Sequence, residues 1–287
     1  MRSSLARLVL LLITAAALLP AAPPKGHLLI IGGGEKLPYI MKRFTDLAGG
    51  PGSKIVVFPM ASSYEENAGT EDVKRMKEQG VENSFYMNIT RAQADDPEMV
   101  QKLDGVTGVF FSGGDQVKLA EAMLGTKMLD RVRAIHAAGG VVGGTSAGAS
   151  VMSRTMVTGN ELIMKDSTQI FFTITKGNVE TKEGFGFVTK AIIDQHFVVR
   201  KRHNRLISMV LERPHLLGVG IDEETCIIVD PKERFEVLGD GLVLVYDASR
   251  ATGITTDRLG SQAAQDIRLH VLKSGDRYDM AAKKPIR

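Results

Sequence analysis

The stretch Gly139-Gly-Val-Val-Gly-Gly-Thr-Ser146-Ala-Gly-Ala-Ser150 joins an apolar run to a serine that has glycines two positions to either side. Gly144, Ser146 and Gly148 match the G-x-S-x-G pattern of a nucleophile elbow, a strained turn between a strand and a helix. Glycine suits the flanking positions because a Cβ would clash in so tight a turn. The helix behind the serine aims backbone N–H groups at developing negative charge. The pattern predicts that Ser146 is a nucleophile; a plain glycine-rich turn is the alternative.

Three further apolar runs precede this one, and each is followed within a few residues by glycine or serine. The four runs in order are His27–Ile31, Lys54–Phe58, Val106–Phe111 and Gly140–Val142. Their nearly continuous apolar character suits parallel strands that are buried on both faces. Helix-like segments lie between them, at Leu37–Ala48, Glu71–Gln79, Ala92–Leu103 and Val117–Ala138. This alternation predicts an α/β fold with a doubly wound, mostly parallel sheet.

The second half of the chain changes character. Asn204–Leu211 favours a helix, and short β-like runs separated by Gly, Asp and Pro follow it. These runs are Leu216–Ile221, Thr225–Val229, Phe235–Leu238, Leu242–Tyr246 and Ile267–Leu272. They are typical of antiparallel strands at the edge of a parallel sheet. No repeat, low-complexity linker or charge block marks a boundary, so we expect residues 23–287 to form a single domain.

The N-terminus has the layout of a secretory signal peptide. Arg2 and Arg7 precede an apolar run from Leu8 to Leu19, and small residues and prolines follow it. The alternative, an uncleaved membrane anchor, is disfavoured because the run is short for a bilayer span of about 20 residues. We expect cleavage near Ala22, so that residues 1–22 are the signal peptide. The mature protein is then secreted, periplasmic or extracellular, with no stable membrane insertion.

The composition excludes several classes of partner and cofactor. Residues 1–22 hold two arginines and no acidic residue, so their removal lowers the formal net charge from +3 to +1. This balance gives no support to a nucleic-acid partner. Cys226 is the only cysteine, which excludes an internal disulfide, and its apolar neighbours favour a buried side chain over a reactive thiol. Without an H-E-x-x-H motif or a paired Cys/His cluster, no metal is expected.

Two glycine loops follow predicted strands. Gly32-Gly-Gly-Glu-Lys36 lacks the G-x-G-x-x-G pattern and the G-K-[ST] ending of phosphate-binding loops, so no nucleotide cofactor is expected. Ser112-Gly-Gly-Asp-Gln116 lies beyond another strand, where ligands of open α/β sheets bind. The backbone N–H groups of Gly114 and Ala147 are candidate oxyanion-hole donors. A tight turn without a chemical role is the alternative for this loop.

A serine nucleophile needs a general base and usually an acid that orients the base. Among the six histidines we favour His196, which closes the strand-like segment Ala191–Phe197 among polar residues; a structural role is its alternative. Asp222 and Glu223 follow a later strand and are both candidates for the acid. Adjacent residues on an extended strand point to opposite sides, so only one of them can face the imidazole. The pattern alone does not decide between them.

Taken together, these residues resemble the cyanophycinases and, more broadly, the aspartyl dipeptidase-like serine peptidases. The resemblance spans nearly the whole mature chain. It is carried by Phe111–Gln116, Gly143–Gly148, Ile193–Phe197 with Arg200, Arg202 and Arg205, Gly220–Glu223, and Leu269–Asp279. The Asp-Gln-His-Phe sequence with its spaced arginines is far more specific than G-x-S-x-G. The resemblance implies a flavodoxin-like fold related to the class I glutamine amidotransferases, with serine in place of their cysteine.

The resemblance also implies an activity and a set of site residues. The family consists of serine exopeptidases that hydrolyse cyanophycin, a poly-aspartate whose β-carboxyls carry arginine, to β-Asp-Arg dipeptides. By matching motif, Ser146 is the nucleophile, His196 the base and Glu223 the orienting acid. The residues implied to line the substrate pocket are Gln116, Asp194, Gln195, Arg200, Arg202 and Arg205. Arginines suit the substrate's carboxylates, and Asp194 or an acidic loop residue suits its guanidinium groups. Without the resemblance, a solvated basic helix is the simpler interpretation of the arginines.

Two other functions remain open from the sequence. One is a secreted dipeptidase for Asp-X or isoaspartyl peptides, because Thr158–Lys190 does not match a familiar substrate loop. The other is a non-catalytic periplasmic binding protein, because a fold does not by itself determine function. The exact substrate and the oligomeric state are also open, with a homodimer as one candidate.

Overall fold

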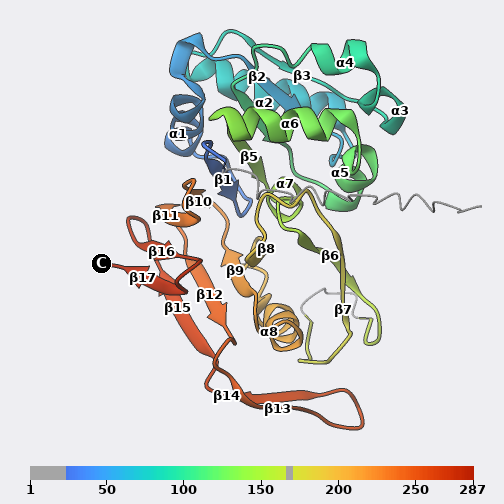
Figure 1. Ribbon diagram of the computed structural model, residues 1–287, viewed down its shortest axis with the longest axis vertical. Coiled ribbons are helices and arrows are strands. Elements are labelled where there is room, and N and C mark those ends of the chain that lie inside the picture. The colour runs from blue at the N-terminus through green and yellow to red at the C-terminus, as the bar shows by residue number, and fades with distance from the viewer. Residues whose placement is uncertain (1–23, 166–170) are drawn as a thin grey trace, which may run out of the picture.

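The computed structural model describes residues 24–165 and 171–287, so the expected signal peptide lies outside the described residues. A nine-stranded sheet with the order β17-β16-β11-β10-β1-β5-β4-β2-β3 runs through the molecule (Figure 1). Its parallel strands are β1 (Leu28–Ile31), β2 (Ile55–Phe58), β3 (Ser84–Tyr86), β4 (Gly108–Phe111) and β5 (Val141–Thr145). Its antiparallel strands are β10 (Thr225–Val229), β11 (Arg234–Gly239), β16 (Arg277–Asp279) and β17 (Lys284–Ile286). This mixed sheet confirms the predicted α/β class with antiparallel C-terminal strands.

Helices cover both faces of the parallel strands, as a doubly wound sheet requires. One face packs against α1 (Pro38–Ala48) and α2 (Glu65–Glu78), which η1 (Gly50–Gly52) and β2 separate along the chain. The other face packs against α3 (Arg91–Ala94), α4 (Pro97–Gln101), α5 (Gln116–Met123), α6 (Lys127–Ala138) and α7 (Ala147–Ser150). Alternate residues of β1 divide between the two cores: Leu28 and Ile30 face one, Leu29 and Ile31 the other. The period of two along a strand produces this division.

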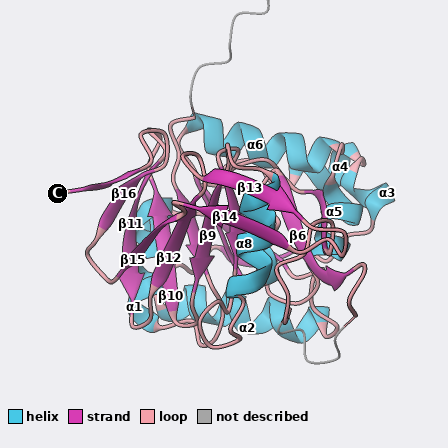
Figure 2. Cartoon of the chain, turned by 90° about the horizontal axis from the view of Figure 1, so that it is seen from below, coloured by secondary structure: helices cyan, strands magenta, loops and turns pink. Residues whose placement is uncertain are grey.

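A second sheet lies beside the first. Its order is β15-β12-β9-β8, formed by β8 (Ala191–Asp194), β9 (Leu217–Ile221), β12 (Val243–Asp247) and β15 (Arg268–Leu272). Helix α8 (His203–Glu212) packs on this sheet, where Leu206 and Met209 share a core with Ile192 and Leu244. Figure 2 shows α8 seen from below the second sheet. Three of the runs that the sequence placed at the edge of one sheet therefore belong to a separate sheet.

Two hairpins complete the described chain. They are β6 (Thr155–Glu161) with β7 (Val179–Glu183), and β13 (Thr252–Thr256) with β14 (Gln262–Gln265). The β13–β14 hairpin extends away from the main sheet, and the β6–β7 hairpin lies beside α8 (Figure 1). These strands are not expected from the sequence, because their residues alternate only weakly between apolar and polar.

Two predicted helices are each divided in the structure. Asp96 caps α4 through the amide of Glu98, and Pro97 begins the helix, so the segment Ala92–Leu103 holds two short helices. Gly125 adopts a φ of 71°, and Thr126 caps α6, which separates α5 from α6. In both cases a helix-starting residue lies inside the expected helix, and its local geometry outweighs the apolar periodicity.

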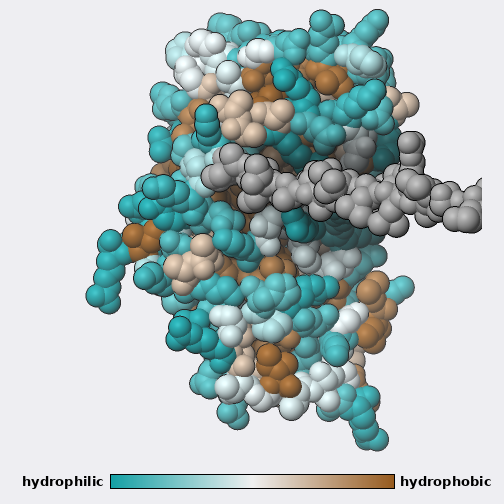
Figure 3. Space-filling model, viewed as in Figure 1, coloured by the Kyte–Doolittle hydropathy of each residue, from teal (hydrophilic) through white to brown (hydrophobic). Residues whose placement is uncertain are grey.

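The face of the molecule in Figure 3 is mostly hydrophilic, and its apolar side chains form scattered patches. Within residues 24–165 and 171–287, no helix combines the length and the apolar character that crossing a bilayer demands. Cys226 is fully buried, and burial raises the pKa of its thiol. The cysteine is therefore a packed core residue, as its apolar neighbours in the sequence predict.

Candidate active site

Three neighbouring parallel strands bring their loops to one point at the carboxyl edge of the sheet. The loop Gly32–Gly34 follows β1, the loop Ser112–Asp115 follows β4, and Ser146 follows β5, which lies between them. The Ser146 amide donates to the carbonyl oxygen of Ile31 at 3.0 Å. A Cβ added at Gly113 would lie 3.3 Å from the Ser146 Cβ. The site thus forms where ligands of open α/β sheets bind.

Ser146 has the backbone of a nucleophile elbow. Its φ of 54° and ψ of −109° lie in a region that L-residues rarely adopt, and α7 begins at the next residue. A Cβ at Gly144 would meet the carbonyl oxygen of Gly148 at 2.6 Å, and a Cβ at Gly148 would meet that of Phe111 at 2.2 Å. Both glycines are therefore required, and the predicted elbow is present.

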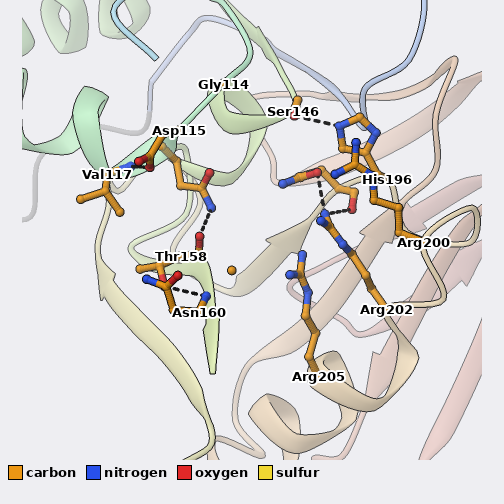
Figure 4. A pocket seen from close by; sticks show the side chains of 13 residues that line it. Gly114, Asp115, Val117, Ser146, Thr158, Asn160, His196, Arg200, Arg202 and Arg205 are labelled. Atoms are coloured by element: carbon orange, nitrogen blue, oxygen red, sulfur yellow. Dashed lines mark hydrogen bonds between the residues drawn. The ribbon is translucent and has the colours of Figure 1, made fainter. Parts of the chain in front are cut away.

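His196 and Glu223 complete a chain of hydrogen bonds that starts at Ser146. The Ser146 Oγ lies 2.8 Å from the His196 Nε2, and the His196 Nδ1 lies 2.5 Å from the Glu223 Oε1 (Figure 4 shows the first contact). His196 follows β8, and Glu223 follows β9, the parallel neighbour of β8. The three side chains selected as a catalytic set from the sequence therefore meet in space.

Asp222 faces the other way and holds the turn after His196. Its Oδ1 accepts hydrogen bonds from the amides of Val198 and Val199, each at 3.1 Å. It is largely buried, at 8% exposure. The choice between the two acids left open by the strand pattern is thus resolved by geometry: Glu223 contacts the imidazole, and Asp222 shapes the backbone behind it.

The glycine loop after β1 supports the histidine and the acid. The carbonyl oxygen of Gly32 accepts the His196 amide at 2.8 Å. A Cβ at Gly33, whose φ is 127°, would lie 2.2 Å from the His196 Cε1, and a Cβ at Gly34 would lie 2.8 Å from the Glu223 Cβ. From the sequence, this loop is assessed only as a nucleotide-binding loop, and its contacts with His196 and Glu223 are not expected. The three consecutive glycines after a strand were the available signal.

The surroundings of His196 favour the neutral form of its imidazole. Burial is the main cause that lowers its pKa below the ordinary value, and the charges of Arg200 and Arg202 lower it further. Glu223 opposes this through its hydrogen bond and its charge. A neutral imidazole that receives a proton at Nε2 is what a general base beside a serine hydroxyl requires.

Two free amides lie beside Ser146. Among the described residues, the N–H groups of Gly114 and Ala147 have no acceptor within the protein. Ala147 is the first residue of α7, and Gly114 lines the same cavity as Ser146. Glycine is required at position 114 because a Cβ there would lie 2.0 Å from the carbonyl oxygen of Ala61. These are the two donors that the sequence predicted for an oxyanion hole.

A cavity of about 450 Å³ opens in front of Ser146 and His196. We call it the arginine pocket; its other walls are Gly114, Asp115, Gln116, Val117, Thr158, Gly159, Asn160, Gln195, Arg200, Arg202 and Arg205. In Figure 4 the arginines lie on the side of His196, and Asp115, Thr158 and Asn160 lie across the cavity from them. Thr158, Gly159 and Asn160 come from β6, within the segment Thr158–Lys190 that does not match a familiar substrate loop.

Asp194 and Arg205 form a buried ion pair at the base of the arginine pocket. Their side chains are 0% and 1% exposed, and the Arg205 Nε donates to the Asp194 Oδ2 at 2.7 Å while Nη2 contacts Oδ1. Asp194 Oδ1 also accepts the amide of Gln195. The expectation that Asp194 accepts a substrate guanidinium needs correction, because its carboxylate is enclosed and already paired with Arg205.

Arg202 is buried and forms no ion pair with an acid among the residues that the structure describes. Its Nη1 donates to the backbone oxygen and to the side-chain Oε1 of Gln195, both at 2.8 Å, and its Nε has no partner. Burial, followed by the charge of Arg205, lowers its pKa to about 9. The arginines at 202 and 205 are therefore not a solvated basic face, as the simpler interpretation had it.

Gln116 and Arg200 take different positions around the arginine pocket. The Gln116 Nε2 donates to the carbonyl oxygens of Val157 and Thr158 at 2.7 and 2.9 Å, which ties β6 to the cavity wall. Arg200 is exposed in the turn before α8, and among the described residues it has no acidic partner. Of the six predicted pocket residues, all but Asp194 line the cavity. In the described part of the chain, no three His, Cys, Asp or Glu side chains are grouped as metal ligands.

Comparisons with known proteins identify the family of the chain. Residues 28–237 match the model of peptidase family S51. The chain is 31% identical over 264 residues to a cyanophycinase of Geminocystis herdmanii, covering 89% of this chain and 94% of that protein. It is 32% identical over 258 residues to a cyanophycinase of Nostoc sp., covering 87% and 84%. The crystal structure of a peptidase from an acI-B1 Actinobacterium shares the fold, with a TM-score of 0.66 and 22% identity over 90% of this chain and 98% of that one. The chain belongs to peptidase family S51 and is a serine-type peptidase.

Proposed function

We propose that this protein hydrolyses cyanophycin and releases β-Asp-Arg dipeptides, with Ser146 as nucleophile, His196 as general base and Glu223 as orienting acid. The observation that carries the proposal is the cationic wall of the arginine pocket, directly beside the Ser146–His196 contact, in which Arg200 and Arg202 form no ion pair within the described residues. The relatives that are named cyanophycinases, at 31% and 32% identity, support the choice of substrate.

Each unit of cyanophycin carries a carboxylate and a guanidinium on an aspartyl backbone, and the pocket offers partners for both. Arg202 has an unpartnered buried Nε and a pKa lowered to about 9, which a bound carboxylate would reverse. On the facing wall, Thr158 and Asn160 hold the Glu180 carboxylate, and the Thr158 hydrogen bond is the main cause that lowers its pKa. With Asp115, this wall suits a guanidinium group.

In the first half of the reaction, the Ser146 Oγ attacks the carbonyl carbon of the scissile peptide bond, and its proton passes to the His196 Nε2. The amides of Gly114 and Ala147 stabilise the oxyanion. When the C–N bond breaks, His196 returns the proton to the leaving amine, and the acyl group stays on Ser146 as an ester.

In the second half, water attacks the ester carbon and gives its proton to His196. The bond to Ser146 Oγ then breaks, His196 reprotonates the serine, and the carboxylic acid product leaves. Glu223 holds the Nδ1–H in place throughout and stabilises the imidazolium that forms in each half.

We further propose that the protein acts outside the cytoplasm after removal of residues 1–22, which follows from the signal-peptide layout of the N-terminus. Expression of the full chain in a secreting host, with mass measurement of the exported protein, tests this. A mature N-terminus near residue 23 is expected, and a cell-associated product of full mass would contradict it. The homodimer considered from the sequence stays a prediction.

The activity is tested by incubation of the wild type and of Ser146→Ala with insoluble cyanophycin, followed by mass analysis of the soluble products. We expect β-Asp-Arg from the wild type alone. Plain poly-aspartate is the control substrate, because it has the backbone without arginine. Cleavage of Asp-X dipeptides together with no release from cyanophycin would instead identify a dipeptidase.

A further inference from the structure

A second cavity, of about 270 Å³, also adjoins the Ser146–His196 contact. The two cavities share Ser146 and His196 as walls. The walls that the second cavity does not share with the arginine pocket include Lys36, Asn67, Glu71, Asp72, Arg75 and Gly113. Lys36 belongs to the loop after β1, and the four polar residues from 67 to 75 belong to α2. None of these side chains has a role in the proposed reaction.

Asp72 organises the charges of the second cavity. It is 1% exposed, and its Oδ2 accepts a hydrogen bond from the Ser112 Oγ at 2.7 Å. Its Oδ1 lies 3.0 Å from the Lys36 Nζ and 3.4 Å from the Arg75 Nη1. Two cations thus share one buried carboxylate, and Arg75 is also close to the Glu71 carboxylate. The Lys36 ammonium has three N–H donors and, in the part of the chain that the structure describes, Asp72 as its one acidic partner, so it retains donors for a ligand.

One face of α2 adds an acidic side chain to the second cavity. Asn67, Glu71 and Arg75 are spaced by four residues, so they lie along one face of the helix. The Glu71 side chain is 47% exposed, and the Arg75 Nη1 lies 3.9 Å from its Oε2. The second cavity therefore resembles the arginine pocket in chemistry: both offer a cation for a carboxylate and an acid for a guanidinium.

We propose that the second cavity binds the cyanophycin unit on the leaving side of the scissile bond, and that Lys36 recognises a carboxylate of that unit. The proposal rests on the proposed function. The arginine pocket holds Gly114, the oxyanion donor, and so takes the unit whose carbonyl is attacked. The polymer then crosses Ser146 and His196 into the second cavity. Lys36 is a specificity residue, held in place by Asp72.

Three substrates separate this role from a general effect on the site. The first is a dimer of β-Asp-Arg. The second is the same dimer with the carboxylates of its leaving unit converted to amides. The third is a single β-Asp-Arg unit whose backbone carboxyl is a p-nitroanilide, which fills only the arginine pocket. kcat/KM is measured on all three for the wild type, Lys36→Gln and Lys36→Arg.

Lys36→Gln should lower kcat/KM about 10-fold on the acidic dimer, the order of one charge-assisted hydrogen bond. It should leave the amidated dimer and the anilide unchanged, and Lys36→Arg should retain most of the activity on the acidic dimer. Lys42→Gln is the matched control, because Lys42 is an exposed lysine of α1 paired with Asp46. Its kinetics should equal those of the wild type.

Equal losses on all three substrates would show that Lys36 acts through Asp72 and Ser112 on the loop beside Ser146, and would overturn the subsite. No loss on the acidic dimer would overturn it as well. These outcomes differ from failure of the proposed function, in which the wild type itself cleaves neither dimer and both proposals fall together.

Discussion

Replacement of Glu223 by glutamine tests the link between the geometry of the site and its chemistry. The carboxylate lies 2.5 Å from the His196 Nδ1, and in the proposed reaction it stabilises the imidazolium that forms when Ser146 attacks. Loss of the equivalent charge in a serine triad costs about 10⁴-fold in turnover. Because the Glu223 side chain is 29% exposed, water screens part of its effect. We therefore expect kcat to fall about 10³-fold, which corresponds to about 4 kcal/mol of transition-state stabilisation.

The same variant should shift the pH profile in a defined direction. In the proposed reaction His196 acts as a base in its neutral form, so we expect activity to be lost as the pH falls through its pKa, which burial holds below the ordinary value. Glu223 raises that pKa, whereas Arg200 lowers it. Glu223→Gln should thus move the acidic limb of kcat/KM to lower pH, and Arg200→Gln should move it to higher pH.

Asp222→Asn is the matched control for this experiment. Its Oδ1 can still accept the amides of Val198 and Val199, so we expect a loss of kcat of no more than about 10-fold. The assay is release of soluble dipeptide from cyanophycin between pH 5 and about 9, with circular dichroism to check that each variant is folded. A larger loss for Asp222→Asn than for Glu223→Gln, or an acidic limb that does not move, would refute the reasoning.

Four further predictions follow from particular contacts. Ser146→Ala should abolish hydrolysis and keep the melting temperature within a few degrees, because it removes the nucleophile and little packing; near wild-type turnover would show another nucleophile. Gly33→Ala should lower kcat at least about 100-fold, since its Cβ would displace the His196 ring, and unchanged kinetics would contradict this support. Arg205→Met should cost about 3–5 kcal/mol in urea unfolding by leaving Asp194 unpaired, and adding Asp194→Asn should restore part of it; no destabilisation would refute the pairing. His136 is buried with a pKa lowered to about 4, so the wild type should lose about 3 kcal/mol of stability as the pH falls from 6.5 to 4, and His136→Gln should lose less over that range.

The parts of the fold that depend on local sequence could be predicted. The apolar runs that became β1, β2, β4 and β5 are buried on both faces, and such runs have no other place in an α/β protein. The second sheet could not be predicted. Its strands β8 and β9 pair residues about 25 positions apart, and nothing in the local sequence of either strand indicates which strand it pairs with. The divided helices show the reverse case, in which Gly125 and Pro97 were visible in the sequence but were given too little weight.

In the candidate site, too, local features could be predicted and contacts between distant elements could not. Ser146 could be predicted from its glycines, because the elbow is a local structure. The strand pattern reduced the acid to two neighbours, and the resemblance rather than the pattern selected Glu223. The roles of Gly33 and Asp72 could not be predicted, since each depends on a side chain that arrives from a distant element: His196 against Gly33, and Lys36 against Asp72.

The arginine pocket shows how one cluster divides its charge between folding and binding. Asp194 neutralises Arg205, and breaking such a buried pair destabilises a fold strongly. Arg202, three residues earlier, lies in the same buried cluster, forms no ion pair with an acid among the described residues, and has a pKa lowered to about 9. A buried cation without a partner costs stability, so an arrangement that pairs one arginine and leaves its neighbour unpaired favours whichever ligand supplies the missing charge. Since Arg202 lines the cavity that also holds Ser146, the charge that completes the cluster has to arrive with the substrate, and an aspartyl polymer rich in carboxylates provides it.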